Sequence, residues 1–128
     1  MTVKHASDEF EPIVAVKAYR LLLATMPTLL KLPKPFRYTL GQAIQTHILN
    51  LLELTYEANA LPGPFREAPI VRAVAKTKLV TLLVRACAES GHLDETAYFR
   101  LATELAEIGK MFGGWLRHIR TTPAERKK

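Results

Sequence analysis

The sequence predicts an all-α protein, an antiparallel up-down-up-down four-helix bundle in a single domain. Breaks rich in proline and glycine divide the 128 residues into four segments. Within each segment, apolar residues recur at steps of three and four, the spacing of one helix face. No segment of useful length alternates apolar and polar residues, as a half-buried strand would. We expect residues 1–121 to form this domain and residues 122–128 to form a short, basic, flexible tail.

The first helix is expected to begin after Ser7 or Asp8, both good N-cap residues, with acidic residues in its first turn. Pro27 lies inside this segment and removes one backbone donor, which predicts a kink or an early stop. Four apolar residues recur along the segment at helical spacing: Ile13, Val16, Leu23 and Leu30.

The second helix is expected over residues 36–60, after a connector in which Pro33 and Pro35 disfavour helix. Its apolar stripe is formed by Leu40, Ile44, Ile48, Leu51, Leu52, Thr55 and Ala58, and polar residues occupy the other side. The third helix is expected from about Glu67 to Ser90, with Pro69 tolerated in its first turn and Gly91 as its C-cap. Its C-terminal half is apolar nearly all round, which predicts burial on two sides, by the bundle and by something else: Leu79, Val80, Leu82, Leu83, Val84 and Cys87.

The fourth helix is expected from about Asp94 to Arg120, with a bundle seam of Tyr98, Leu101, Leu105, Ile108, Phe112, Trp115 and Ile119. Beside the seam runs a strip of small residues spaced by four, three and four, formed by Ala102, Ala106, Gly109 and Gly113. Such a strip lets another helix approach closely, either within the bundle or between subunits. The alternative is a helix end that frays from Gly113 onward.

The formal net charge is +6, and residues 65–128 hold twelve Lys and Arg against seven Asp and Glu. This balance favours acidic partners, nucleic acid above all, although basic surfaces also serve solubility or protein contacts. Cys87 is the only cysteine, which fits a reducing compartment. The N-terminal residues do not form a signal peptide, and the uninterrupted apolar runs are short. We therefore expect a cytoplasmic protein without membrane contact.

No catalytic or cofactor-binding motif is found in the sequence. The Glu-x-x-His spacing of di-iron bundles occurs once, at Glu89 and His92, and Gly91 interrupts the helix between them. We therefore expect no metal, no cofactor and no enzyme activity. The remaining candidates for function are basic residues on helix surfaces and at the first connector. Read as phosphate-contacting or partner-binding residues, as opposed to a solvated face, they are Lys34, Arg37, Arg72, Lys76, Lys78, Arg85, Lys110, Arg117 and Arg120.

Two longer stretches of the sequence form distinctive motifs. The first is Leu32-Pro33-Lys34-Pro35-Phe36-Arg37-Tyr38-Thr39-Leu40-Gly41-Gln42, continuing through Leu51-Leu52-Glu53-Leu54 to Glu57-Ala58. The second is Glu107-Ile108-Gly109-Lys110-Met111-Phe112-Gly113-Gly114-Trp115-Leu116. Together they resemble the "four helix bundle protein" superfamily and, within it, the accessory variability determinant (Avd) of diversity-generating retroelements. The second stretch is similar to that branch's C-terminal signature, Glu-Ile-Gly-Arg-hydrophobic-Leu-Gly-Gly-Trp. The third helix also matches at Lys76 and Arg85, so the resemblance extends from about Tyr19 to Arg117.

The resemblance implies a bundle that assembles into a pentameric barrel with a basic surface. It implies a non-catalytic partner of the retroelement's reverse transcriptase and of its template RNA, with DNA as an open alternative, in mutagenic retrohoming. Carried over by position, the contact residues are Lys34, Arg37, Lys76, Arg85, Lys110 and Arg117. One departure is Thr81, at a position that is often basic in relatives. Sister branches, including proteins encoded in ribosomal RNA intervening sequences, suggest the alternative of an oligomeric interaction protein without a retroelement role.

Overall fold

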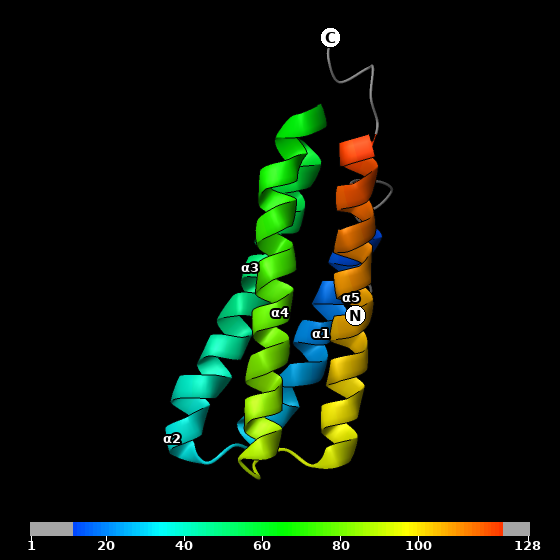
Figure 1. The fold of residues 1–128 in the computed structure, drawn as a ribbon. Helices are drawn as coiled ribbons and strands as arrows, with labels where there is room; N and C mark the ends of the chain where they lie inside the picture. The colour runs from blue at the N-terminus through cyan, green and yellow to red at the C-terminus, as the bar shows by residue number, and fades with distance from the viewer. Residues whose placement is uncertain (1–11, 122–128) are drawn as a thin grey trace, which may run out of the picture.

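The structure, a computed structural model, describes residues 12–121 as four long helices packed side by side (Figure 1). These helices are α1 (Ile13–Leu30), α3 (Gln42–Ala60), α4 (Glu67–Glu89) and α5 (Glu95–Thr121). A short helix α2 (Lys34–Phe36) and a π-helical turn η2 (Arg37–Gly41) lead into α3, and a 3₁₀ turn η3 (Gly63–Arg66) leads into α4. Both α1 and α4 pack against α3 and α5, and successive long helices run in opposite directions. The predicted all-α four-helix bundle is confirmed.

The core lies between the four helices and is built from aliphatic side chains around Phe112, which is fully buried. The predicted seam of α5 is confirmed, because Leu101, Leu105, Ile108, Phe112 and Ile119 are buried. Tyr98 and Trp115 are partly buried and pack against the same core. The apolar stripe of α3 is buried at Ile44, Ile48, Leu51, Thr55 and Ala58.

Three threonines are the buried polar residues of the described core: Thr25, Thr55 and Thr77. Each hydroxyl donates a hydrogen bond to a backbone carbonyl of its own helix, to Leu22 at 2.9 Å, Leu51 at 2.7 Å and Ala73 at 2.8 Å respectively. This satisfies the buried donor without a partner on a neighbouring helix.

The four apolar positions that recur at helical spacing in the first helix do not mark the core face of α1, although Val16 among them is partly buried. Ile13, Leu23 and Leu30 are 69%, 49% and 67% exposed, and Tyr19 and Met26 are also exposed. The residues of α1 that enter the core are instead Val14, Ala15, Ala18, Leu21, Thr25 and Leu29. Because α1 is apolar nearly all round, the periodicity fits two faces equally well. The outward face therefore leaves large apolar side chains uncovered along the length of the helix.

By length and composition, α1 also passes as a membrane-crossing helix. It has 18 residues with a mean hydropathy of 1.5, and 33% of it is buried inside the fold. The core helix of a soluble protein and a signal sequence near the N-terminus meet the same criteria. The expectation of no membrane contact rested on uninterrupted apolar runs, and it stays a prediction.

Most helix boundaries agree with those predicted, with three differences. The early stop at Pro27 is wrong, because α1 continues to Leu30, and buried residues on both sides of the proline hold it in the bundle. The second helical segment begins at Lys34, since Pro35 is accommodated in the first turn. The fraying from Gly113 is also wrong, because α5 runs through to Thr121. The predicted N-caps Ser7 and Asp8 and the predicted tail, residues 122–128, lie outside the described residues.

Candidate nucleic-acid and partner interface

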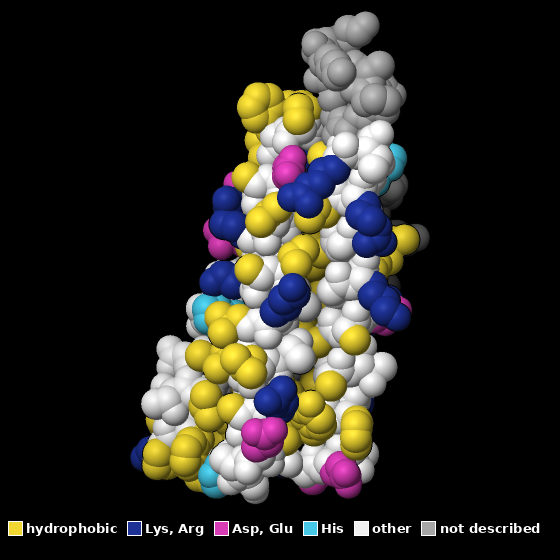
Figure 2. Space-filling view, viewed as in Figure 1, with side chains coloured by type: hydrophobic (Ala, Val, Ile, Leu, Met, Phe, Trp, Pro, Cys, Tyr) yellow, Lys and Arg dark blue, Asp and Glu magenta, His cyan; other side chains and the backbone are white. Residues whose placement is uncertain are grey.

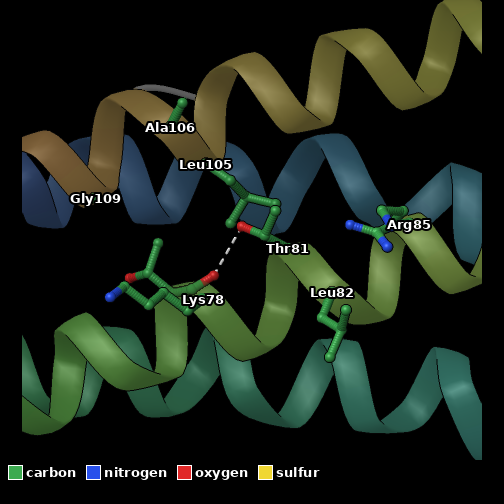
Figure 3. Close-up of a pocket in the computed structure, with 8 residues that line it drawn as sticks. Lys78, Thr81, Leu82, Arg85, Leu105, Ala106 and Gly109 are labelled. Carbon is green, nitrogen blue, oxygen red and sulfur yellow. Dashed lines mark hydrogen bonds between the residues drawn. The ribbon is translucent and has the colours of Figure 1, made fainter.

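A groove lies between α4 and α5 on the outside of the bundle (Figure 3). It consists of two adjoining hollows of about 320 and 570 Å³ that share Thr77, Lys78, Ala106 and Gly109. We call it the basic groove. Its lining from α4 is Val74, Thr77, Lys78, Thr81, Leu82 and Arg85, and its lining from α5 is Leu105, Ala106, Gly109, Lys110, Gly113 and Arg117.

Three of the four small residues predicted on the fourth helix line the α5 side of this groove, namely Ala106, Gly109 and Gly113, whereas Ala102 does not line it. A Cβ atom built on Gly109 would lie 3.6 Å from Thr77 Cγ2, an ordinary van der Waals distance. Close approach to α4 therefore does not require the glycine. Each interior glycine costs about 0.5–1 kcal/mol relative to alanine, and no tight contact in the described chain offsets that cost at Gly109. Ala106 is exposed, so the strip opens outward.

Arg117 lies back along α5 over two glycines. Its guanidinium Nη1 would be 3.6 Å from a Cβ built on Gly113, and its Nη2 would be 3.8 Å from one built on Gly114. Because these positions carry no side chain, the guanidinium reaches the groove close to the helix surface. The residue itself is exposed. The glycines thus place a cation at the end of the groove.

Four of the predicted basic residues meet at the basic groove: Lys78 and Arg85 from α4, and Lys110 and Arg117 from α5. All four are exposed. Arg85 Nε forms an ion pair with Glu89 Oε2 at 3.1 Å, one helical turn away. Among residues 12–121, no carboxylate lies within ion-pair distance of the other three. The groove therefore carries an excess of positive charge at its rims.

Leu82 and Val74 belong to this surface although neither was predicted as a site residue. The sequence signal was present for Leu82, because the third helix is apolar nearly all round in its C-terminal half. The predicted burial on two sides does not occur within this chain, since Leu79 and Leu82 are 37% and 55% exposed. Thr81, the departure from the family pattern, also lines the groove, and its hydroxyl donates to the Thr77 carbonyl at 2.8 Å.

The other predicted cations lie elsewhere. Arg72 pairs with Glu57 across α4 and α3, its Nη2 lying 3.4 Å from Oε2, and Arg120 pairs with Glu67 across α5 and α4 at 2.9 Å. Figure 2 shows that the Lys and Arg side chains on this face are separated by hydrophobic ones along α4 and α5. The basic surface is therefore mixed, and the basic groove is the place where predicted cations from two helices converge.

Lys34 and Arg37 lie at the end of the bundle where α1 turns into α3. Lys34 is exposed, whereas Arg37 is half-buried and its Nη2 donates to the Leu32 carbonyl at 3.3 Å. The Arg37 Nε is buried without a hydrogen-bond partner. The Arg37 side chain therefore bonds to the connector between α1 and α3, and it is less available to a partner than the side chain of Lys34.

Lys76 faces α3 and lies apart from the basic groove. Its Nζ is 3.1 Å from His47 Nδ1, a part-buried contact between α4 and α3. Desolvation lowers the pKa of His47, and the nearby Lys76 charge lowers it further. A neutral imidazole accepts a hydrogen bond from the ammonium, whereas a protonated imidazole would repel it. This contact between α4 and α3 therefore requires an unprotonated His47.

The described residues hold no group of three His, Cys, Asp or Glu side chains arranged to bind a metal ion. Cys87 is buried, and desolvation raises the pKa of its thiol, which disfavours the reactive thiolate.

Comparison with known proteins does not assign this chain to a family. Neither the models of protein families, nor the curated proteins, nor the solved structures contain a match to this chain. The resemblance to the Avd family stays a prediction that rests on its two motifs. The first of these motifs runs through α2, η2 and α3, and the second lies on α5, where Gly109, Lys110 and Gly113 line the basic groove.

Proposed function

We propose that the chain is a non-catalytic accessory protein of a diversity-generating retroelement, which binds the reverse transcriptase and template RNA through its basic surface and supports mutagenic retrohoming. In this proposal the protein acts in the cytoplasm as a homo-oligomer, a pentamer by the family resemblance. It uses no cofactor and holds neither metal nor membrane contacts.

The observation that supports this proposal is the convergence of cations at the basic groove. Lys78, Lys110 and Arg117 reach solvent from two helices without a carboxylate partner in the described chain. Unpaired cations on one surface attract phosphates or acidic side chains, and neutralising phosphates releases counterions. The groove thus gives both proposed partners, one nucleic acid and one protein, a physical reason to bind here.

The test is binding of template RNA and of the reverse transcriptase by purified protein. Lys110→Glu/Arg117→Glu is compared with Arg20→Glu/Arg100→Glu, which makes the same charge change at exposed positions outside the groove. We expect the first variant to lose binding to both partners and the second to keep most of it. For single-stranded RNA, removal of two phosphate contacts lowers the slope of log affinity against log salt by about 1.4.

Failure of the wild-type protein to bind either partner at low salt contradicts the proposal. Equal losses in both double variants would show a general charge effect in place of a specific surface. Light scattering on the same samples checks that the variants keep the assembly of the wild type.

The second candidate function is an oligomeric interaction protein of the ribosomal RNA intervening-sequence type, without a retroelement role. The outward face of α1 favours it, because Ile13, Leu23 and Leu30 are large apolar residues exposed on one helix. Assembly that persists while RNA and reverse transcriptase do not bind would select this function.

A further inference from the structure

The basic groove has the length of a short helix. It extends from Val74 to Arg85 on α4 and from Leu105 to Arg117 on α5. At 1.5 Å per residue these stretches are about 17–18 Å long, or roughly three helical turns. An occupant of this length contacts both α4 and α5 throughout.

The residues that line the groove between its cations are apolar apart from two threonines, and those on α5 include residues with little or no side chain. We call them the floor of the groove. Leu82 and Leu105 line one hollow, Val74 lines the other, and Ala106 and Gly109 line both. The threonine hydroxyls there are already used, since Thr77 and Thr81 both donate to carbonyls of α4. A phosphodiester chain would find few free donors at this floor and would leave its apolar surface uncovered. Small residues instead admit the ridge of another helix.

The rims of the groove carry the charge. Lys78 and Arg85 lie on the α4 side, and Lys110 and Arg117 lie on the α5 side. A floor of apolar atoms between two cationic rims is complementary to a helix that has an apolar ridge with acidic residues on both flanks. This charge complementarity argues against a second copy of α1 as the occupant, because Ile13–Leu30 contains no Asp or Glu.

We infer that the basic groove binds an acidic amphipathic helix of the protein partner. This inference rests on the proposed function and refines it: the groove floor takes the protein, and template RNA contacts cations without entering the floor. The partner is defined by its chemistry, an apolar ridge at positions i, i+3, i+4 and i+7 with Glu or Asp beside it.

The test uses a synthetic helical peptide of about 18 residues, or five turns, with a leucine ridge flanked by glutamates. A peptide of the same composition with the leucines redistributed around the helix is its control. Fluorescence anisotropy measures both against the wild-type protein. We expect the ridged peptide to bind at least about tenfold more tightly than its control.

Two kinds of groove variant separate the contribution of the apolar floor to peptide binding from the contribution of the cations. Ala106→Leu fills the floor at an exposed position and leaves all four cations in place, whereas Lys78→Glu/Lys110→Glu reverses the charge of one cation on each rim and leaves the floor open. We expect each to weaken the ridged peptide about tenfold, and Arg20→Glu/Arg100→Glu to leave it unchanged. Template RNA binding should survive Ala106→Leu. Gly109→Leu repeats the floor test at a second position, and circular dichroism confirms that the variants are folded.

Equal binding of the two peptides overturns the inference, as does unchanged peptide binding by both floor variants. A loss of self-association in Ala106→Leu would assign the groove to a second copy and would also overturn it. If RNA and reverse transcriptase fail to bind while the ridged peptide binds as expected, the proposed function fails and the groove assignment stands.

Discussion

Replacing Gly109 by alanine tests whether the groove of the single chain is open or filled by a tightly packed helix. The residue lies inside α5, where glycine lowers helix stability by about 0.5–1 kcal/mol relative to alanine. The added Cβ would meet Thr77 Cγ2 at 3.6 Å, so it fits without displacement. We therefore expect Gly109→Ala to raise the free energy of unfolding by about 0.5–1 kcal/mol.

The measurement is thermal unfolding followed by far-UV circular dichroism, at two protein concentrations to detect effects of assembly. For a chain of this size, 1 kcal/mol corresponds to about 4 °C in melting temperature, so the expected rise is about 2–4 °C. Gly114→Ala is the matched control, because its Cβ would meet only the Arg117 guanidinium at 3.8 Å and it does not line the groove.

Gly41→Ala is expected to change the free energy of unfolding in the opposite direction. There a Cβ would lie 3.2 Å from Leu32 Cδ1 and 3.5 Å from the Phe36 carbonyl oxygen, and Leu32 is 1% exposed. Because the buried leucine has to shift by a few tenths of an ångström against its packed neighbours, we expect a loss of about 1 kcal/mol. If Gly109→Ala lowers the melting temperature as Gly41→Ala does, while Gly114→Ala raises it, then Gly109 is in close contact with another helix and the reasoning from an open groove is refuted.

Two further predictions concern the His47–Lys76 pair and the outward face of α1. The lowered pKa of His47 means that the unfolded chain binds more protons, so its contribution to stability is complete above the ordinary histidine pKa and is lost as the pH falls through the folded-state value. We expect His47→Gln to reduce this pH dependence of the free energy of unfolding, measured by denaturant titrations between about pH 5 and 7.5. An unchanged pH profile would contradict this role of His47. Leu23→Glu/Leu30→Glu places charge on exposed positions of α1, so the helix content should be retained while the mass in light scattering falls. An unchanged mass would show that this face is not covered in the assembly.

The periodicity of the sequence predicted the helices because each begins or ends at a proline or glycine break. It predicted the buried face of α5 because that helix is polar on the other side, with Lys110 and Glu107 exposed. It failed on α1, where apolar residues surround the helix and no polar face excludes the wrong choice. Packing against α3 and α5 decides that orientation, and such packing depends on residues distant in sequence.

The candidate site was predicted in its residue types and only in part in its arrangement. Spacing placed Lys78 and Arg85 two turns apart on one helix, and Lys110 and Arg117 two turns apart on another. Whether the two pairs face each other depends on how α4 and α5 rotate in the bundle, which no local pattern specifies. The same rotation turns Lys76 toward His47 on α3, away from the groove.

The buried threonines bear on how the bundle responds to a partner. Thr25, Thr55 and Thr77 all direct their hydroxyls to their own helices, so these buried groups form no directional bond from one helix to the next. The spacing between α4 and α5 is then set at this depth by side-chain packing, which tolerates small sliding movements better than a fixed hydrogen-bond network does. Because Thr77 bonds only to Ala73 of its own helix, a small sliding of α4 against α5 under a bound partner would break no hydrogen bond of this buried hydroxyl.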